Sequence, residues 1–88
     1  MQERWVQELL GRTPGAETAR LELVQQRGGR RVYRLTRAQG ERDWYLKLGD
    51  DHQLRQEADV LARLSACPAV PHLVAHGAAV GYRYVITE

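Results

Sequence analysis

Apolar residues near the start of the chain recur three or four positions apart, which is the spacing of a helix face. Between Gln2 and Leu10 these residues are Trp5, Val6, Leu9 and Leu10. Gly11 and then Thr13-Pro14-Gly15 follow, and glycine and proline are common just beyond a helix C-terminus. The pattern predicts a short amphipathic helix.

The pattern then changes to the apolar and polar alternation that is typical of strands. Two alternating segments run from Thr18 to Gln26 and from Arg31 to Arg37, and Gly28-Gly29 between them predicts a hairpin turn. A second turn at 38–41 precedes the segment RDWYLKL, from Arg42 to Leu48. Because connections this short join antiparallel neighbours, three antiparallel strands are expected.

A second helical pattern runs from about His52 or Gln53 to Ala66, after the candidate N-cap residues Asp50 and Asp51. Two further strands are predicted, Leu73 to His76 and Tyr82 to Thr87. The expected fold class is therefore α+β. We expect a curled five-stranded antiparallel sheet that carries one packed helix, with a short helix at the N-terminus, in a single domain over residues 1–88.

Composition fits such a domain. Hydrophobic residues make up 43% of the 88 residues and charged residues 27%, which is a globular and not a disordered profile. The formal net charge of +2 is too small to indicate nucleic acid or membrane. The single cysteine, Cys67, cannot form an internal disulfide, and we expect it to be buried at a helix end. With no signal peptide or membrane span in the pattern, a soluble cytoplasmic protein is expected.

Two charged residues interrupt the apolar pattern. Side chains alternate along a strand, so Tyr45 and Lys47 point to one face of the third strand, opposite to Trp44, Leu46 and Leu48. On the second helix, a rotation of about 100° per residue places Glu57 near the centre of the apolar stripe. That stripe consists of Leu54, Val60, Leu61 and Leu64.

An unpaired buried carboxylate costs roughly several kcal/mol, so Glu57 needs a cation or the edge of a cleft. Lys47 is the only lysine of the sequence and lies on the strand that leads into this helix. We therefore expect the two side chains to form an ion pair. The alternative is that Lys47 extends from an edge strand and that Glu57 reaches solvent at the rim.

The order of these elements resembles the small lobe of kinases: a glycine turn between two strands, a lysine on the third, a glutamate on the next helix, then two strands. In detail the chain looks like the aminoglycoside phosphotransferase family. The similar stretches are VYRL (32–35), WYLKL (44–48), LRQEADVLARL (54–64), VPHLVAHG (70–77) and YVITE (84–88).

This resemblance implies an ATP site. Lys47 would contact the α- and β-phosphates, Glu57 would pair with Lys47 and orient it, and Gly28 and Gly29 would cover the phosphates. The adenine pocket would be lined by Val32, Tyr45 and Ile86. In the parent protein, the γ-phosphate of ATP would pass to a hydroxyl of an aminoglycoside or another small polar acceptor.

The chain also departs from the family. The glycine turn is followed by Arg30 and Arg31, where the family often has a serine. The family motif HGDxxxxN is absent, since His76-Gly77 is followed by Ala78 and the sequence has no asparagine. The resemblance implies Mg²⁺, but the residues that would bind it are absent from this chain.

The sequence ends at Glu88, where the family has its hinge between lobes. We therefore expect an N-terminal lobe of a truncated phosphotransferase that is inactive without its C-terminal lobe. The surface for that missing lobe would be exposed, so a homodimer or an exchanged strand is a possible arrangement.

Other interpretations are a small nucleic-acid-binding module and a non-catalytic interaction module. The first depends on a basic hairpin with Arg27, Arg30, Arg31, Arg34 and Arg37. Such runs are usually solvated strand faces, so nucleic acid is the weaker hypothesis. No metal site is expected, because His72 and His76 are too far apart on a strand for easy chelation and no cysteine or carboxylate motif accompanies them.

Overall fold

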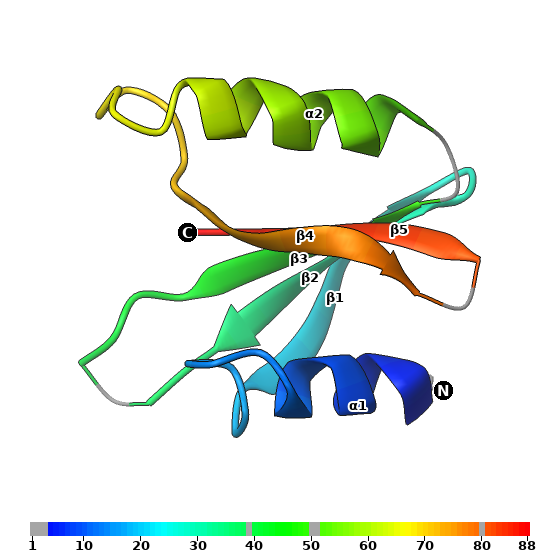
Figure 1. Cartoon of the computed structure of the whole chain (residues 1–88). Helices are drawn as coiled ribbons and strands as arrows, with labels where there is room; N and C mark the ends of the chain where they lie inside the picture. Colours follow the sequence, from blue (N-terminus) through cyan, green and yellow to red (C-terminus); the bar gives the residue numbers. More distant parts are fainter. Residues whose placement is uncertain (1–3, 39, 50–51, 80) are drawn as a thin grey trace.

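A five-stranded antiparallel sheet lies between two helices in the computed structural model of the chain (Figure 1). The structure describes residues 4–38, 40–49, 52–79 and 81–88. Its elements are α1 (Arg4–Gly11), β1 (Arg20–Arg27), β2 (Arg30–Thr36), β3 (Trp44–Gly49), α2 (His52–Arg63), β4 (Leu73–Ala79) and β5 (Tyr82–Thr87). This arrangement confirms the predicted α+β fold class.

The strand order in the sheet is β1-β2-β3-β5-β4, and each neighbouring pair is antiparallel. The hairpins β1–β2 and β4–β5 lie on either side of β3, and β3 pairs with β5 after the chain has passed through α2 and β4. Gly28 in the first hairpin turn has a φ of 59°, which favours glycine over other residues. The sheet thus has β1 and β4 at its edges and β3 at its centre.

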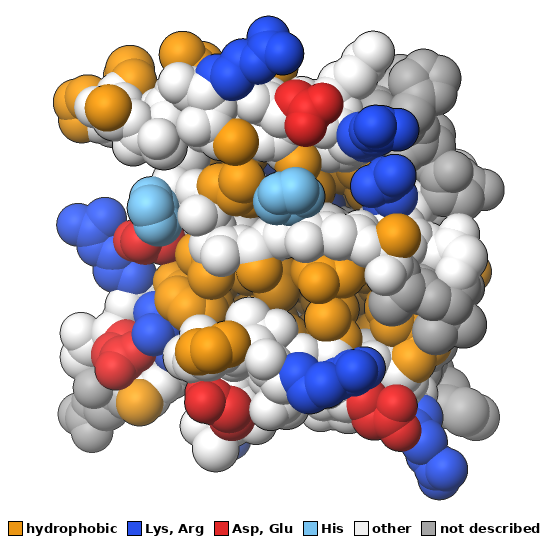
Figure 2. Space-filling model, in the orientation of Figure 1, with side chains coloured by type: hydrophobic (Ala, Val, Ile, Leu, Met, Phe, Trp, Pro, Cys, Tyr) orange, Lys and Arg blue, Asp and Glu red, His pale blue; other side chains and the backbone are white. Residues whose placement is uncertain are grey.

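The main hydrophobic core lies between the sheet and α1. From β3, Trp44, Leu46 and Leu48 point into it, as the alternation of the sequence predicts. From α1 it receives Val6, Leu9 and Leu10. The short N-terminal helix therefore covers part of one face of the sheet, a role that its own sequence pattern does not reveal. Figure 2 shows hydrophobic side chains at the surface between β4 and α1, where this core reaches solvent.

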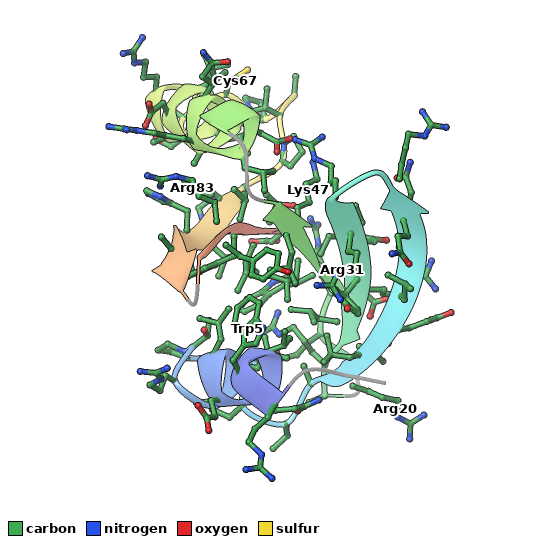
Figure 3. All side chains as sticks on the ribbon, turned by 90° about the vertical axis from the view of Figure 1, so that its right-hand side faces the viewer. Trp5, Arg20, Arg31, Lys47, Cys67 and Arg83 are labelled. Atoms are coloured by element: carbon green, nitrogen blue, oxygen red, sulfur yellow. The ribbon has the colours of Figure 1, made fainter. Side chains whose placement is uncertain are left out.

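On the other face, α2 packs on β3, β4 and β5 through a smaller cluster. Its buried members are Leu54, Ala58, Leu61 and Val85. The β1–β2 hairpin extends beyond α2 in the side view (Figure 3). We call this side of the sheet the Lys47 face, because Lys47 points to it, and we call the opposite side the α1 face.

Some boundaries differ from the predicted ones. α2 ends at Arg63 and not at Ala66, so Cys67 lies in the turn segment beyond the helix. Cys67 is exposed, and the prediction that it is buried is wrong. The predicted N-cap residues Asp50 and Asp51 lie outside the described residues. Among the residues that are described, no helix is long and apolar enough to cross a membrane.

Candidate functional site

Lys47 and Glu57 form an ion pair between β3 and α2. The Nζ atom of Lys47 lies 2.6 Å from Oε1 of Glu57. About two thirds of each side chain is removed from solvent, with 29% of Lys47 and 30% of Glu57 exposed. The structure therefore confirms the expected pairing, and the charges that interrupt the apolar pattern compensate each other.

The packing of α2 explains why Glu57 reaches the lysine. Leu54, Ala58 and Leu61 are at most 8% exposed and fix the face of the helix that meets the sheet. Val60 and Leu64, by contrast, are 50% and 42% exposed, so the buried stripe is narrower than the sequence pattern predicts. Glu57 consequently lies at the margin of the stripe and not at its centre.

The ion pair leaves hydrogen-bonding capacity unused. An ammonium group has three donors, and the hydrogen bond to Glu57 uses one of them. The second carboxylate oxygen of Glu57, Oε2, is buried and has no hydrogen-bond partner within the described part of the chain. A buried acceptor without a partner costs about 1–3 kcal/mol, so the arrangement can gain stability from a bound polar group or water.

Val32 and Tyr45 lie beside the pair on the Lys47 face. Val32 is the β2 partner of Lys47, and Tyr45 precedes Lys47 by two residues on β3. Arg34 is the cross-strand partner of Tyr45. The pKa of Arg34 is raised above its usual value, chiefly by hydrogen bonding to Tyr45. The Nη1 atom of Arg34 also lies 3.6 Å from Oε1 of Glu22. Tyr45 thus lies on the sheet next to the ion pair, with Arg34 as its cross-strand partner.

The predicted phosphate cover, Gly28-Gly29, lies at the end of the same hairpin. Both glycines are exposed, and a Cβ atom added to Gly28 would have no atom within 4 Å. Val32 is the β2 residue that pairs with Lys47, and Gly29 lies three residues before Val32 in the chain. This corresponds to about 10 Å. The turn is open to a ligand, with no side chain of its own between the backbone amides and solvent.

Ile86 does not belong to this group. It pairs with Leu46, is fully buried and lies in the core on the α1 face. Its neighbour Val85 is the residue that faces Lys47. Of the six predicted nucleotide-binding residues, Val32, Tyr45 and Lys47 lie together on the Lys47 face. Gly28 and Gly29 lie at the turn of the β1–β2 hairpin, and Ile86 lies on the α1 face.

One residue on this face was not singled out by sequence reasoning as a site residue. Arg30 begins β2 and faces Arg27 across the hairpin, on the same side as Val32. Arg31 points to the α1 face, where its guanidinium lies 5.9 Å from the centre of the Tyr82 ring. The available signal was strand alternation, because Arg30 lies two positions before Val32 and therefore points to the same face.

A Mg²⁺ site does not fit these residues. The carboxylate nearest to the lysine, Glu57, is paired with that cation. In the ranges that the structure describes, no three His, Cys, Asp or Glu residues are grouped so that they could hold a metal ion. A phosphate group fits better, since donors and positive charge predominate here.

Comparisons of this chain with protein-family models, curated proteins and solved structures found no match.

Proposed function

We propose that the Lys47 face binds ATP and that this domain is the nucleotide-binding lobe of a phosphotransferase similar to the aminoglycoside phosphotransferases. The observation that carries the proposal is the 2.6 Å ion pair between Lys47 on the central strand and Glu57 on α2. In a kinase small lobe, a strand lysine binds the α- and β-phosphates and a helix glutamate holds that lysine in place.

The ion pair is suited to this role. Glu57 accepts one hydrogen bond from the ammonium group and fixes its position, while the remaining N–H donors can bind phosphate oxygens. The residual exposure of 29% at Lys47 gives a ligand access to the charge without complete desolvation of it. Hydrogen bonds that involve charged groups contribute about 1.5–3 kcal/mol each, which is enough to position a phosphate.

In this proposal, the residues beside the lysine on the Lys47 face contact the adenine ring of the ligand. Val32 and Tyr45 offer apolar and aromatic surface directly beside the lysine, and both are half-buried. Arg34 is the cross-strand partner of Tyr45. Gly28-Gly29 supplies exposed backbone amides farther along the hairpin, and such amides can approach phosphates closely.

Binding and chemistry are separate in this proposal. Transfer of the γ-phosphate to a hydroxyl requires a carboxylate that orients the acceptor and ligands for the metal ion. The sequence has no HGD motif and no asparagine, so the residues present hold and orient the nucleotide. In the proposed enzyme, a second lobe provides the catalytic groups and selects the aminoglycoside or other small polar acceptor.

The test is a titration of ¹⁵N-labelled protein with ATP, followed by NMR. We expect shift changes at Lys47, at its neighbours on β2 and β3, and at the glycine turn. K47M should weaken ATP binding by about tenfold or more, because a charged hydrogen-bond donor is lost. R63M is the matched control, since it removes one positive charge from the exposed last residue of α2.

The absence of any shift change at millimolar ATP, or equal binding by K47M and the original protein, would contradict the proposal. The basic hairpin supplies a second candidate, because Arg20, Arg27, Arg30 and Arg34 share the Lys47 face. If the hairpin binds nucleic acid, a single-stranded oligonucleotide should bind with an affinity that falls steeply with salt and is unaffected by K47M.

A further inference from the structure

Arg30 and Arg31 are adjacent in sequence but have different surroundings. The Arg31 side chain donates a hydrogen bond to the Tyr33 hydroxyl at 3.4 Å and lies over the Tyr82 ring. The same ring stacks on Trp5 of α1, with a distance of 5.5 Å between ring centres. Arg31 thus belongs to a cluster that attaches α1 to the sheet, and both Arg31 and Trp5 are labelled there in Figure 3.

Arg30 points to the opposite side, the Lys47 face, because side chains alternate along β2. Its cross-strand partner is Arg27, so two positive charges face each other at the end of the hairpin. Like charges directly opposite on neighbouring strands are destabilising. An anion bound between them would remove that repulsion.

Two carboxylates of this face, Glu22 and Glu57, already have other partners. Glu22 lies 3.6 Å from Arg34, and Glu57 is bonded to Lys47. Over the described ranges of the chain, the Arg30 side chain has no ion pair or hydrogen bond. The positive charge of Arg30 is therefore available to a ligand, unlike that of Arg34.

The position of Arg30 relative to Lys47 fits a chain of phosphates. Val32 is the direct neighbour of Lys47, and Arg30 lies two residues farther along the same strand. This separation is about 7 Å along the backbone, which a flexible arginine side chain can span. The planar guanidinium can also bind two phosphate oxygens at once, which a serine hydroxyl cannot do.

We propose that Arg30, assisted by Arg27, binds the terminal phosphates of the nucleotide and makes this site selective for nucleoside triphosphates over monophosphates. The inference rests on the proposed ATP site and deepens it. Lys47 holds the phosphates nearest the nucleoside, and Arg30 supplies the positive charge for the phosphates beyond them. The arginine pair thereby takes the place of the serine that the glycine turn lacks.

The test compares ATP, ADP and AMP affinities of the 88-residue chain and its variants by NMR titration. R30A should weaken ATP binding by about tenfold and AMP binding by less than about twofold. R30K should recover part of the ATP affinity, since a positive charge remains. R27A should have a smaller effect in the same direction.

Two controls separate local binding from net charge and from folding. R20A removes the same charge on the same face, but at the other end of β1, where Arg20 is labelled in Figure 3. It should leave the affinities for ATP, ADP and AMP unchanged. R31A removes the neighbouring charge on the α1 face. It should lower the melting temperature without changing the preference for ATP over AMP.

The outcomes distinguish this inference from the proposed function. If the original protein binds ATP and R30A prefers ATP over AMP to the same degree, the proposed role of Arg30 is wrong. The proposed ATP site on the Lys47 face is then unaffected. An equal loss of ATP affinity in R20A and R30A would also overturn it, because the effect would then be general electrostatics. If the original protein binds none of the three nucleotides, both proposals fail.

Discussion

The half-buried position of Glu57 determines the energetics of its pairing with Lys47. At 30% exposure, the carboxylate has lost much of its water, and the ion pair replaces part of that solvation. Removal of one member leaves the other charge partly buried without its partner, which is costlier than removal of both. Loss of one partner should therefore cost more here than at a fully exposed surface salt bridge.

This asymmetry predicts the result of a double-mutant cycle. K47M should lower the free energy of unfolding by about 1–3 kcal/mol, since Glu57 loses its cation. The double variant K47M/E57L should lie within about 1 kcal/mol of the original protein, because both polar groups are then replaced by apolar ones. Urea unfolding followed by tryptophan fluorescence measures each value.

Equal losses in the single and double variants would show that the two charges are not energetically coupled. The surface variant R63M serves as the baseline for loss of one positive charge. It should change the free energy of unfolding by less than about 0.5 kcal/mol.

At the scale of elements, the segment between α1 and β1 is tied to the sheet by specific contacts. The Arg37 side chain donates a hydrogen bond from Nε to the Gly15 carbonyl at 2.8 Å. Its guanidinium lies 3.7 Å from the centre of the Trp44 ring, and Arg37 also pairs with Glu41. The Thr13 hydroxyl donates to the Leu9 carbonyl at 2.8 Å, which completes the end of α1.

G15A should disrupt this connection. Gly15 has a φ of 94°, and an added Cβ would lie 2.7 Å from the Trp44 ring, which is only 8% exposed. We expect a loss of about 2–4 kcal/mol in the free energy of unfolding from the clash and the backbone strain together. G40A is the matched control, because Gly40 has a φ of 88° but nothing within 4 Å of its added Cβ.

The control should cost about 1–2 kcal/mol, which represents the backbone strain alone. Thermal or urea unfolding of the two variants gives the difference that belongs to the contact with Trp44. If G15A and G40A were equally stable, that contact would not contribute.

Local patterns predicted the elements better than their mutual arrangement. The alternation in β3 correctly separated Lys47 and Tyr45 from Leu46, because side-chain direction along one strand is a local property. The face of Ile86 depends on how β5 pairs with β3, and those strands are joined only after α2 and β4. Sequence periodicity does not contain that register, so the predicted position of Ile86 in the site was not supported.

The same limit explains other differences. Val60 and Leu64 have helical spacing with the buried leucines, but both are exposed, and Leu64 lies just beyond the end of α2. Cys67 was expected at the end of a longer helix, while α2 ends at Arg63 and leaves it exposed. The extent of a buried helix face is set by the partner surface and not by the helix sequence.

For the whole molecule, two clusters on opposite faces of one sheet depend on different helices. The larger one includes α1, while the smaller one joins α2 to β5 and the α2–β4 segment. The proposed nucleotide contacts both β3 and the β1–β2 hairpin beyond α2. A ligand at this position would link the hairpin to the α2 side of the sheet and stabilise the folded state.

That linkage can be measured by thermal unfolding. A ligand that binds only the folded state stabilises it by RT ln(1 + [L]/Kd), or about 1.4 kcal/mol at ATP ten times above Kd. For a domain of this size, that corresponds to a rise of about 5–10 °C in Tm. ATP should therefore raise Tm, AMP should raise it less at the same concentration, and K47M should reduce the rise that ATP produces. An equal rise with ATP in the original protein and in K47M would place the bound nucleotide elsewhere on the molecule, since the lysine contributes only at the proposed site.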